Sequence, residues 1–234
     1  MVDVQVQDNL ARVRSRIKAA CNQYGRDPGE VKLLAVTKTV KPERVRMALD
    51  AGQTDFGENY LQEARAKIAT LNDPNITWHY IGGIQSNKTS EIARNFHWVH
   101  TVSRNRIAVR LSDQRPEDLD PLKVLVQVNI SGEASKAGIA PGETADLVTS
   151  MIGLPGIELR GLMAIPAPAH DFETQREGFR ALRELLQEIQ AQHGAELPYF
   201  SDLSMGMSND LEAAIAEGAT WLRVGTAIFG PRQQ

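Results

Sequence analysis

Residues 31–56 read VKLLAVTKTVKPERVRMALDAGQTDF, and this stretch decides the fold class. It opens with a short apolar run at 31–36 that is rich in β-formers. A helical pattern follows over 42–51, with Pro42 at a first-turn position and Gly52 as its stop. A second short strand is predicted at 54–56. Strand, helix and strand in this order form a βαβ unit, whose two strands pair in parallel.

The same unit recurs along the rest of the chain. Strands are predicted at residues 31–36, 54–56, 76–81, 98–101, 124–130, 157–163, 199–203 and 220–224. Helices are predicted between them at residues 42–51, 60–71, 87–95, 105–112, 143–152, 172–193 and 210–217. Eight such units close into a (β/α)8 TIM barrel, an α/β fold of about 250 residues. A doubly wound open sheet is the alternative, but it favours a GxGxxG turn where this chain has Thr37-Lys38-Thr39.

One more helix is predicted before the first strand. Leu10, Val13, Ile17 and Ala20 recur at three- and four-residue steps, which places one apolar stripe along a helix. We expect this extra N-terminal helix to cap the bottom of the barrel. The eighth unit leaves little chain after it, so residues 1–234 are predicted to form a single TIM-barrel domain.

Composition excludes several classes of partner. The net charge of −3 arises from 26 basic and 29 acidic residues, which argues against a nucleic-acid partner. No run approaches about 18 apolar residues, so no membrane partner is expected. Cys21 is the only cysteine, which suits a reducing compartment, and the first ten residues lack a signal-peptide pattern. We therefore predict a cytoplasmic protein, and we predict no metal site.

The candidate site follows from the barrel, because such sites lie at the C-terminal ends of the strands. Lys38 is the first polar side chain after the apolar strand at 31–36. A lone lysine is usually a solvated surface residue. At a barrel mouth, however, partial desolvation favours its neutral amine, which reacts with aldehydes. Lys38 is therefore a candidate for covalent attachment of a ligand.

The loops after the seventh and eighth strands form the usual phosphate site of this fold. Gly206 permits a tight turn, and a helix is predicted to start at Ser208–Asp210 with Asn209 and Glu212 as a capping pair. The N–H groups at such a helix start attract an anion. Gly225 permits close approach of the backbone to a ligand, and Thr226 supplies a hydroxyl. Two ordinary strand-to-helix turns are the alternative.

An amine and an anion cradle at one mouth fit a ligand that carries an aldehyde and a phosphate. Pyridoxal 5′-phosphate (PLP) is such a ligand. With PLP in this cavity, Arg223, at the end of the eighth strand, is expected to face the pyridine nitrogen. A guanidinium only donates hydrogen bonds, so it holds this nitrogen unprotonated and weakens the ring as an electron sink.

These features occur within eight motifs that follow one another along nearly the whole chain. They are AVTK at 35–38, FGENYLQE at 56–63, WHYIG at 78–82, QSNK at 85–88, SKAG at 135–138, RGLMAIP at 160–166, LSMGMSND at 203–210 and RVGTAIFG at 223–230. With them the chain resembles the pyridoxal phosphate homeostasis proteins, a PLP-binding family that looks like the barrel half of alanine racemase. One departure is visible in the loop after the third strand. The family commonly reads IG-x-LQ-x-NK there, whereas in this chain Gly83-Ile84 precede Gln85.

The resemblance implies a role for each motif residue. It implies that Lys38 holds PLP as an aldimine in intracellular PLP homeostasis. The remaining cofactor-binding residues that it implies are Met207, Ser208, Gly225 and Thr226 at the phosphate, Arg223 at the ring nitrogen, and Asn59 and His79 at the mouth. Lys136, in the loop after the fifth strand, matches a family lysine that assists release. As alternatives, Asn59 caps a helix, His79 belongs to the core, and Lys136 is a solvent-exposed lysine.

Three functions remain open at this point. The resemblance favours a carrier, which stores PLP and passes it to apo-enzymes without turnover of its own, and we expect a monomer. A PLP-dependent amino-acid racemase is the alternative, but it needs an acid or base on each face of the cofactor, and only Tyr60 lies near the mouth. A sugar-phosphate enzyme needs a catalytic carboxylate or a metal cluster, and Glu58 is the only obvious carboxylate at the mouth.

Overall fold

Strands and helices alternate along the chain in this computed structural model, which describes residues 4–133 and 136–231. The strands are β1 (Lys32–Val36), β2 (Asp55–Glu58), β3 (Thr77–Tyr80), β4 (Trp98–Val102), β5 (Leu122–Val128), β6 (Ile157–Ala164), β7 (Asp202–Ser204) and β8 (Trp221–Val224). The α-helices are α1 (Val4–Gln23), α2 (Pro42–Asp50), α3 (Leu61–Leu71), α4 (Thr89–Asn95), α5 (Asn105–Asp113), α6 (Pro141–Met151), α7 (Phe172–His193), α8 (Leu211–Ala216) and α9 (Thr226–Phe229). Two short 3-10 turns, η1 (Pro28–Glu30) and η2 (Ser86–Lys88), complete the described elements.

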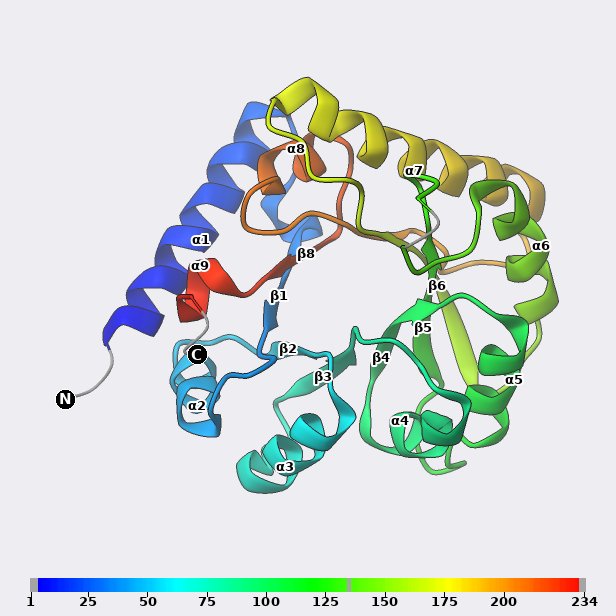
Figure 1. Cartoon of the computed structure of the whole chain (residues 1–234), viewed down its shortest axis with the longest axis horizontal. Coiled ribbons are helices and arrows are strands. Elements are labelled where there is room, and N and C mark those ends of the chain that lie inside the picture. The colour runs from blue at the N-terminus through cyan, green and yellow to red at the C-terminus, as the bar shows by residue number, and fades with distance from the viewer. Residues whose placement is uncertain (1–3, 134–135, 232–234) are drawn as a thin grey trace.

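The eight strands close into a parallel barrel. Each strand pairs with its neighbour in sequence, and β1 also pairs with β8 through Leu34 opposite Arg223 and Ala35 opposite Val224. Figure 1 looks through this ring of strands, with helices around it. The predicted (β/α)8 fold is confirmed, and the open doubly wound sheet is excluded because its edge strands would stay unpaired.

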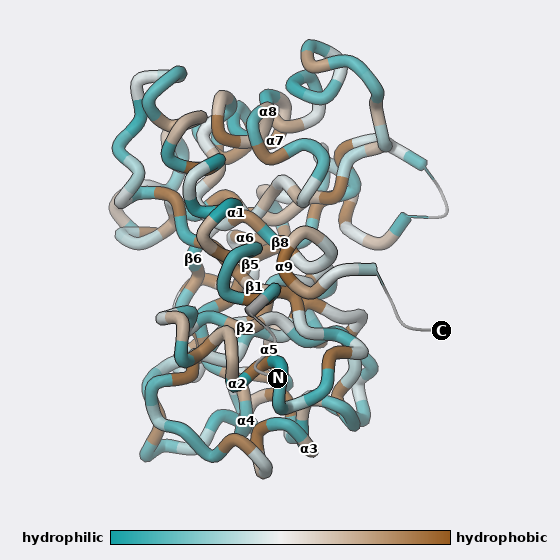
Figure 2. The backbone as a smooth tube through the Cα atoms, turned by 90° about the vertical axis from the view of Figure 1, so that its left-hand side faces the viewer, coloured by the Kyte–Doolittle hydropathy of each residue, from teal (hydrophilic) through white to brown (hydrophobic). Residues whose placement is uncertain are grey.

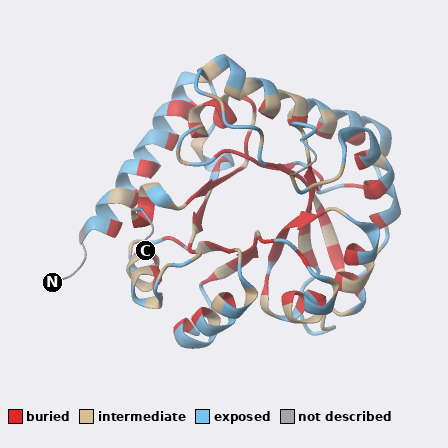
Figure 3. Cartoon of the chain, viewed as in Figure 1, coloured by how far each residue is buried: buried red, intermediate tan, exposed pale blue. Residues whose placement is uncertain are grey.

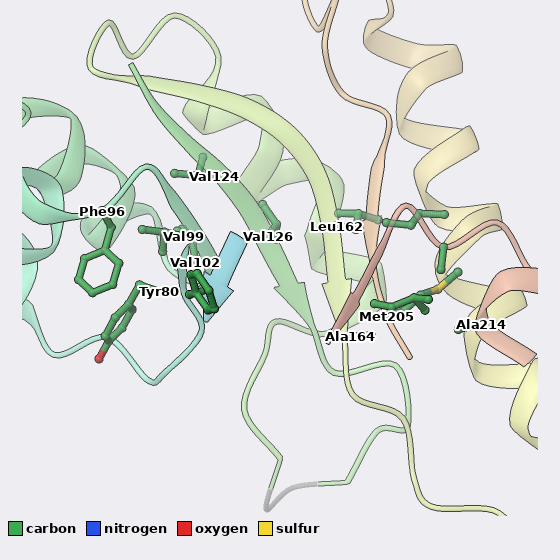
Figure 4. Close-up of a cluster of buried hydrophobic side chains, with 14 of the residues drawn as sticks. Tyr80, Phe96, Val99, Val102, Val124, Val126, Leu162, Ala164, Met205 and Ala214 are labelled. Carbon is green, nitrogen blue, oxygen red and sulfur yellow. The ribbon is translucent and has the colours of Figure 1, made fainter. Parts of the chain in front are cut away.

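Side chains alternate between the inside and the outside of this ring. Inside, one cluster of buried side chains fills the barrel, namely Leu34, Trp98, Leu125, Met163 and Trp221. Outside, a larger core lies between the strands and the helices. Figure 4 shows part of this outer core, in which the ring of Tyr80 lies against that of Phe96 with centroids 5.2 Å apart. Buried residues accordingly follow the strands in Figure 3, whereas hydrophilic residues follow many of the outer turns in Figure 2.

The extra helix α1 does not cap the bottom of the barrel, contrary to the prediction. It lies outside the ring of strands in Figure 1 and packs against α2, α8 and α9. The reason is the length of its neighbours, because α8 has six residues and α9 only four. The apolar stripe of α1 covers the wall that these short helices leave open, and Val6, Leu10 and Val13 are buried there.

Two elements near the C-terminus also differ from the prediction. Strand β7 begins at Asp202, three residues after the predicted start at Tyr199. Tyr199 is exposed and Phe200 fills the outer core from the loop, although both are strong β-formers. The short helix α9 was not predicted at all. It directly follows β8, where it helps to form the mouth of the barrel. No helix in the described part of the chain is long and apolar enough to cross a membrane.

Candidate functional site

A cavity of about 480 Å³ opens at the C-terminal ends of the strands. Its volume falls within the range of small-molecule pockets. The predicted site residues that line it are Lys38, Asn59, Met207, Ser208, Arg223, Gly225 and Thr226. The fold therefore brings together, at one mouth, the lysine after β1 and the two glycine-bearing loops after β7 and β8.

Lys38 enters the cavity because of strand alternation. Leu34 belongs to the interior cluster, and Val36 and Lys38 follow it at two-residue steps and line the cavity above it. Thr37 continues the ladder, since its N–H donates to the Gly57 carbonyl at 2.9 Å. Thr39 then has a left-handed φ of 61°, which turns the chain away. The lysine is half-buried at the point where the strand ends.

Glu58 does not lie in the cavity, so its prediction as a mouth carboxylate is wrong. Strand alternation turns its side chain outward, toward α3, where it is fully buried. There it accepts hydrogen bonds from Lys67 at 2.7 Å and from the Thr37 hydroxyl at 2.5 Å. Burial raises the pKa of Glu58 above its ordinary value, although Lys67 opposes this shift. The carboxylate that does line the cavity is Asp210, after β7.

The loop after β7 depends on a glycine. Gly206 has a φ of +88°, and a Cβ at this position would lie 2.5 Å from the Cβ of Ala214. A side chain is therefore excluded both by backbone conformation and by space. Past this turn, the backbone N–H groups of Ser208 and Asn209 donate to no acceptor among the described residues. Two unpaired donors at a cavity wall suit an anionic ligand.

The predicted capping pair in this loop is wrong. Helix α8 begins only at Leu211, and no side chain caps it. Asp210 instead accepts a hydrogen bond from the Met207 N–H at 2.5 Å, which closes the loop on itself. Glu212 forms an ion pair with Arg16 of α1 at 2.9 Å. The extra helix thus supports the loop from outside.

The loop after β8 lies close against β1. A Cβ on Gly225 would lie 3.2 Å from the Val36 carbonyl oxygen, so a side chain here would displace the neighbouring strand. The end of α9 is held from two other helices. Asn9 of α1 donates to the Ile228 carbonyl at 2.9 Å, and Arg44 of α2 donates to the Phe229 carbonyl at 2.7 Å.

Arg223 is the buried cation of the cavity. Its guanidinium donates to the Ser204 hydroxyl at 2.7 Å and to the Ala164 carbonyl at 2.9 Å. These two bonds fix the plane of the guanidinium. Burial lowers the pKa of Arg223 to about 10, which leaves it charged at neutral pH.

Asn59 is a cavity residue with an unsatisfied acceptor. It does not cap α3, because the residue before that helix is Tyr60, which makes no side-chain cap. The Asn59 Oδ1 atom is buried and accepts no hydrogen bond from any described residue. Buried polar atoms are almost always paired, so an orphaned oxygen at a cavity wall indicates a ligand that donates to it.

Two predicted residues lie elsewhere. His79 does not line the cavity, because its side chain is fully buried deeper in the barrel, where it contacts Asp55 and His100. Its prediction as a mouth residue is therefore wrong, and the alternative as a core residue is right. Lys136 forms an ion pair with Glu133 at 2.8 Å in the loop after β5 and is not among the residues that line the cavity. Ser135, also in this motif, lies outside the described residues.

Sequence reasoning missed two polar residues that contact the predicted site from within. They are His100 on β4 and Ser204 at the end of β7. Both are fully buried, and His100 stands two residues after the interior Trp98. A polar residue at an inward position of an apolar strand is the signal that would have identified His100.

Comparisons with known proteins give consistent matches over nearly the whole chain. Residues 8–233 match the family described as alanine racemase, N-terminal domain. The chain is similar to the pyridoxal phosphate homeostasis protein of Pseudomonas aeruginosa, with 53% identity over 227 residues that cover 97% of this chain and 96% of that one. The protein of the same name from Escherichia coli is 47% identical over 230 residues, which cover 97% of each chain.

Comparison with solved structures also finds similar folds. PipY of Synechococcus elongatus, in a structure with PLP bound, has a TM-score of 0.83 and 36% identity, and covers 97% of this chain and 100% of that one. An alanine racemase from Corynebacterium glutamicum has a TM-score of 0.69 at 19% identity, covering 96% of this chain and 61% of that one. This second likeness concerns the fold alone.

Proposed function

The chain belongs to the family of the pyridoxal phosphate homeostasis proteins, and on that premise we propose that it binds PLP in the cavity at the mouth of its barrel. One observation carries the proposal. A single cavity joins a half-buried lysine, a buried arginine and the two glycine-bearing loops after β7 and β8, which match the aldehyde, the ring nitrogen and the phosphate of PLP. The relatives named for PLP homeostasis and the PLP-bound PipY structure support the same ligand.

Each wall of the cavity has its own part in this proposal. Lys38 would hold the cofactor through its amine, and PLP when bound would supply an aldehyde that condenses reversibly with an amine and releases water. The N–H groups and hydroxyls around Ser208 and Thr226 would hold the phosphate, with Gly225 and Met207 lining the same part of the cavity. Because Arg223 can only donate, it keeps the ring nitrogen unprotonated. The free oxygen of Asn59 accepts a hydrogen bond from the ligand.

We propose a carrier without turnover of its own, which stores PLP and delivers it to apo-enzymes. A racemase needs an acid or base on each face of the cofactor. The described residues that line the cavity include no tyrosine and no histidine, and Tyr60 is exposed outside it. Asp210 is already held by the Met207 N–H. These observations favour the carrier over the alternative of an amino-acid racemase.

The proposed carrier acts as a monomer in the cytoplasm, and residues 1–234 form one domain. All residues around the cavity come from one closed barrel, which supports a site that needs no second subunit. Lys136, held by Glu133 away from the cavity lining, is proposed to assist release from the loop after β5.

The test is the absorption spectrum of the purified protein with PLP, followed by borohydride reduction and peptide mass mapping. We expect a visible band that reduces onto Lys38, and we expect Lys38→Ala to lose it. Lys41→Ala is the matched control, because Lys41 lines the same cavity three residues further on. A label on Lys41, or no band at all, refutes the proposal. Racemisation of amino acids that Lys38→Ala abolishes would establish the racemase instead.

A further inference from the structure

A line of hydrogen bonds crosses the inside of the barrel from the cavity to the opposite face. Arg223 donates to the Ser204 hydroxyl at 2.7 Å, and this oxygen lies 2.9 Å from His100 Nδ1. His100 Nε2 lies 3.0 Å from His79 Nδ1, and His79 Nε2 lies 3.1 Å from Asp55 Oδ1. We refer to these five residues as the interior network.

The two ends of the interior network fix the direction of every bond in it. A guanidinium only donates, so the Ser204 oxygen accepts from Arg223 and its one proton is free for His100 Nδ1. An ionised carboxylate only accepts, so Asp55 receives the proton of His79 Nε2. Neutral histidines then have a single consistent state, in which both carry the proton on Nε2. Every hydrogen bond points from the cavity toward Asp55.

Burial supports neutral histidines. His79 and His100 are both fully buried, and burial lowers the pKa of each. Arg223 and His79 lower the pKa of His100 further, whereas Asp55 partly opposes the shift at His79. The other charged or titratable groups that act on His79 are Lys32 of β1 and His97, and both also disfavour its cation.

Aromatic walls leave the two imidazoles few other partners. Trp98 stacks on His79 with centroids 5.5 Å apart and planes 8° from parallel. Trp221 stands edge-on to His79 at 4.8 Å and to His100 at 6.2 Å. The rings are therefore held in place by packing, and the hydrogen bonds of the network determine which nitrogen of each ring carries the proton.

We propose that the interior network is a positioning device for Arg223, and that Asp55 at the far face thereby helps to hold the guanidinium toward the ring nitrogen of PLP. The identity of this ligand rests on the proposed function. Asp55 is the first residue of β2, at the N-terminal end of the barrel, and its side chain is 25% exposed. It lines a second cavity, which shares no residue with the PLP site.

The first test needs no PLP. Nitrogen-15 NMR of the histidine side chains in the full chain should show His79 and His100 neutral, with the proton on Nε2, throughout the neutral pH range. Asp55→Asn keeps an acceptor and should keep this pattern. Asp55→Ala removes the acceptor and should change the state of His79. A proton on Nδ1 of either ring in the parent protein, or titration of either ring near its ordinary pKa, overturns the network.

The second test measures PLP binding and the absorption band of the bound cofactor. Asp55→Ala should weaken PLP binding by about tenfold, the lower end of what outer-shell partners contribute at metal sites. It should also shift the pH transition of the visible band to lower pH. A loosened Arg223 lets the ring nitrogen take up a proton, and this nearby positive charge favours loss of the proton from the Lys38 linkage.

Asp73→Ala is the matched control. Asp73 is a carboxylate of similar exposure, 20%, which pairs with Arg46 outside the barrel, and its loss should leave the band and the affinity unchanged. An Asp55→Ala protein with altered histidines but an unchanged band and affinity overturns the positioning role while PLP binding stands. A parent protein that takes up no PLP overturns the proposed function, and with it the ligand named here, whereas the NMR spectra still report on the network.

Discussion

Replacing Lys67 with methionine removes the cation from a buried ion pair that contacts Thr37, the residue before Lys38. Lys67 is 6% exposed and Glu58 not at all, and their charged atoms lie 2.7 Å apart. Lys67 also donates at 2.5 Å to the carbonyl of Thr37, the residue before Lys38. Removing one partner of a buried pair costs about 3–5 kcal/mol, because the other charge stays uncompensated. With an m-value of about 2.5–3 kcal/mol/M, the urea midpoint falls by about 1–2 M.

The loss should depend on pH. Burial already raises the pKa of Glu58, and losing Lys67 removes the main opposing influence. The folded state then holds a proton that the unfolded chain, with an ordinary glutamate pKa of about 4.3, releases. Stability is therefore fully present below this unfolded pKa and falls as the pH rises through the folded pKa.

The assay is urea unfolding of parent and variant across a series of pH values. The control is the double variant with Glu58→Gln and Lys67→Met, which removes both charges, keeps an acceptor for Thr37, and should recover stability at neutral pH. A Lys67→Met protein that loses less than about 1 kcal/mol, with no dependence on pH, would refute the reasoning, because so small a loss is typical of exposed pairs.

Three further outcomes are expected. Gly206→Ala should cost about 1–2 kcal/mol for its left-handed backbone and about 1–3 kcal/mol more for its overlap with Ala214, measured by thermal unfolding. Gly218→Ala, with a φ of +94° but no atom nearer than 3.7 Å, should show only the first part. Ser208→Ala should weaken PLP binding by about 10- to 100-fold if its hydroxyl bonds the phosphate, which equilibrium titration measures, and an unchanged affinity contradicts that contact. PLP at about 100 times its dissociation constant should stabilise the parent by about 2.7 kcal/mol, and an equal gain in Lys38→Ala at the same concentration would contradict attachment at Lys38.

Much of the fold was predictable because most elements have clear local signals. Helix α7 runs over 172–193 as its apolar periodicity predicts, and Pro42 marks the start of α2. Strand β7 was misplaced because Tyr199 and Phe200 have strong β-propensity but belong to a loop. Propensity is local, whereas the ladder depends on the partner, and β6 pairs with β7 only from Asp202 onward.

The candidate site was predictable where a residue follows the end of a strand. Lys38, Ser208 and Gly225 belong to loops whose place at the mouth follows from the barrel itself. Residues inside strands were harder, as Glu58 and His79 show. Alternation gives two faces, but which face is inside is known only when the register with both neighbours is known.

The pairing of β1 with β8 has a consequence for the order of events during synthesis. Lys38 is made long before Arg223 and the loop that follows it. A nascent chain that ends before β8 therefore carries Lys38 beside an open strand edge, and it lacks the cavity wall that Arg223 and the loop after β8 supply. Pairing β8 with β1 also closes the longest loop between any two neighbouring strands of the barrel, which makes this step intrinsically slow. PLP binding at the proposed site therefore requires that β8 has already paired with β1, so PLP would bind complete barrels in preference to incomplete ones.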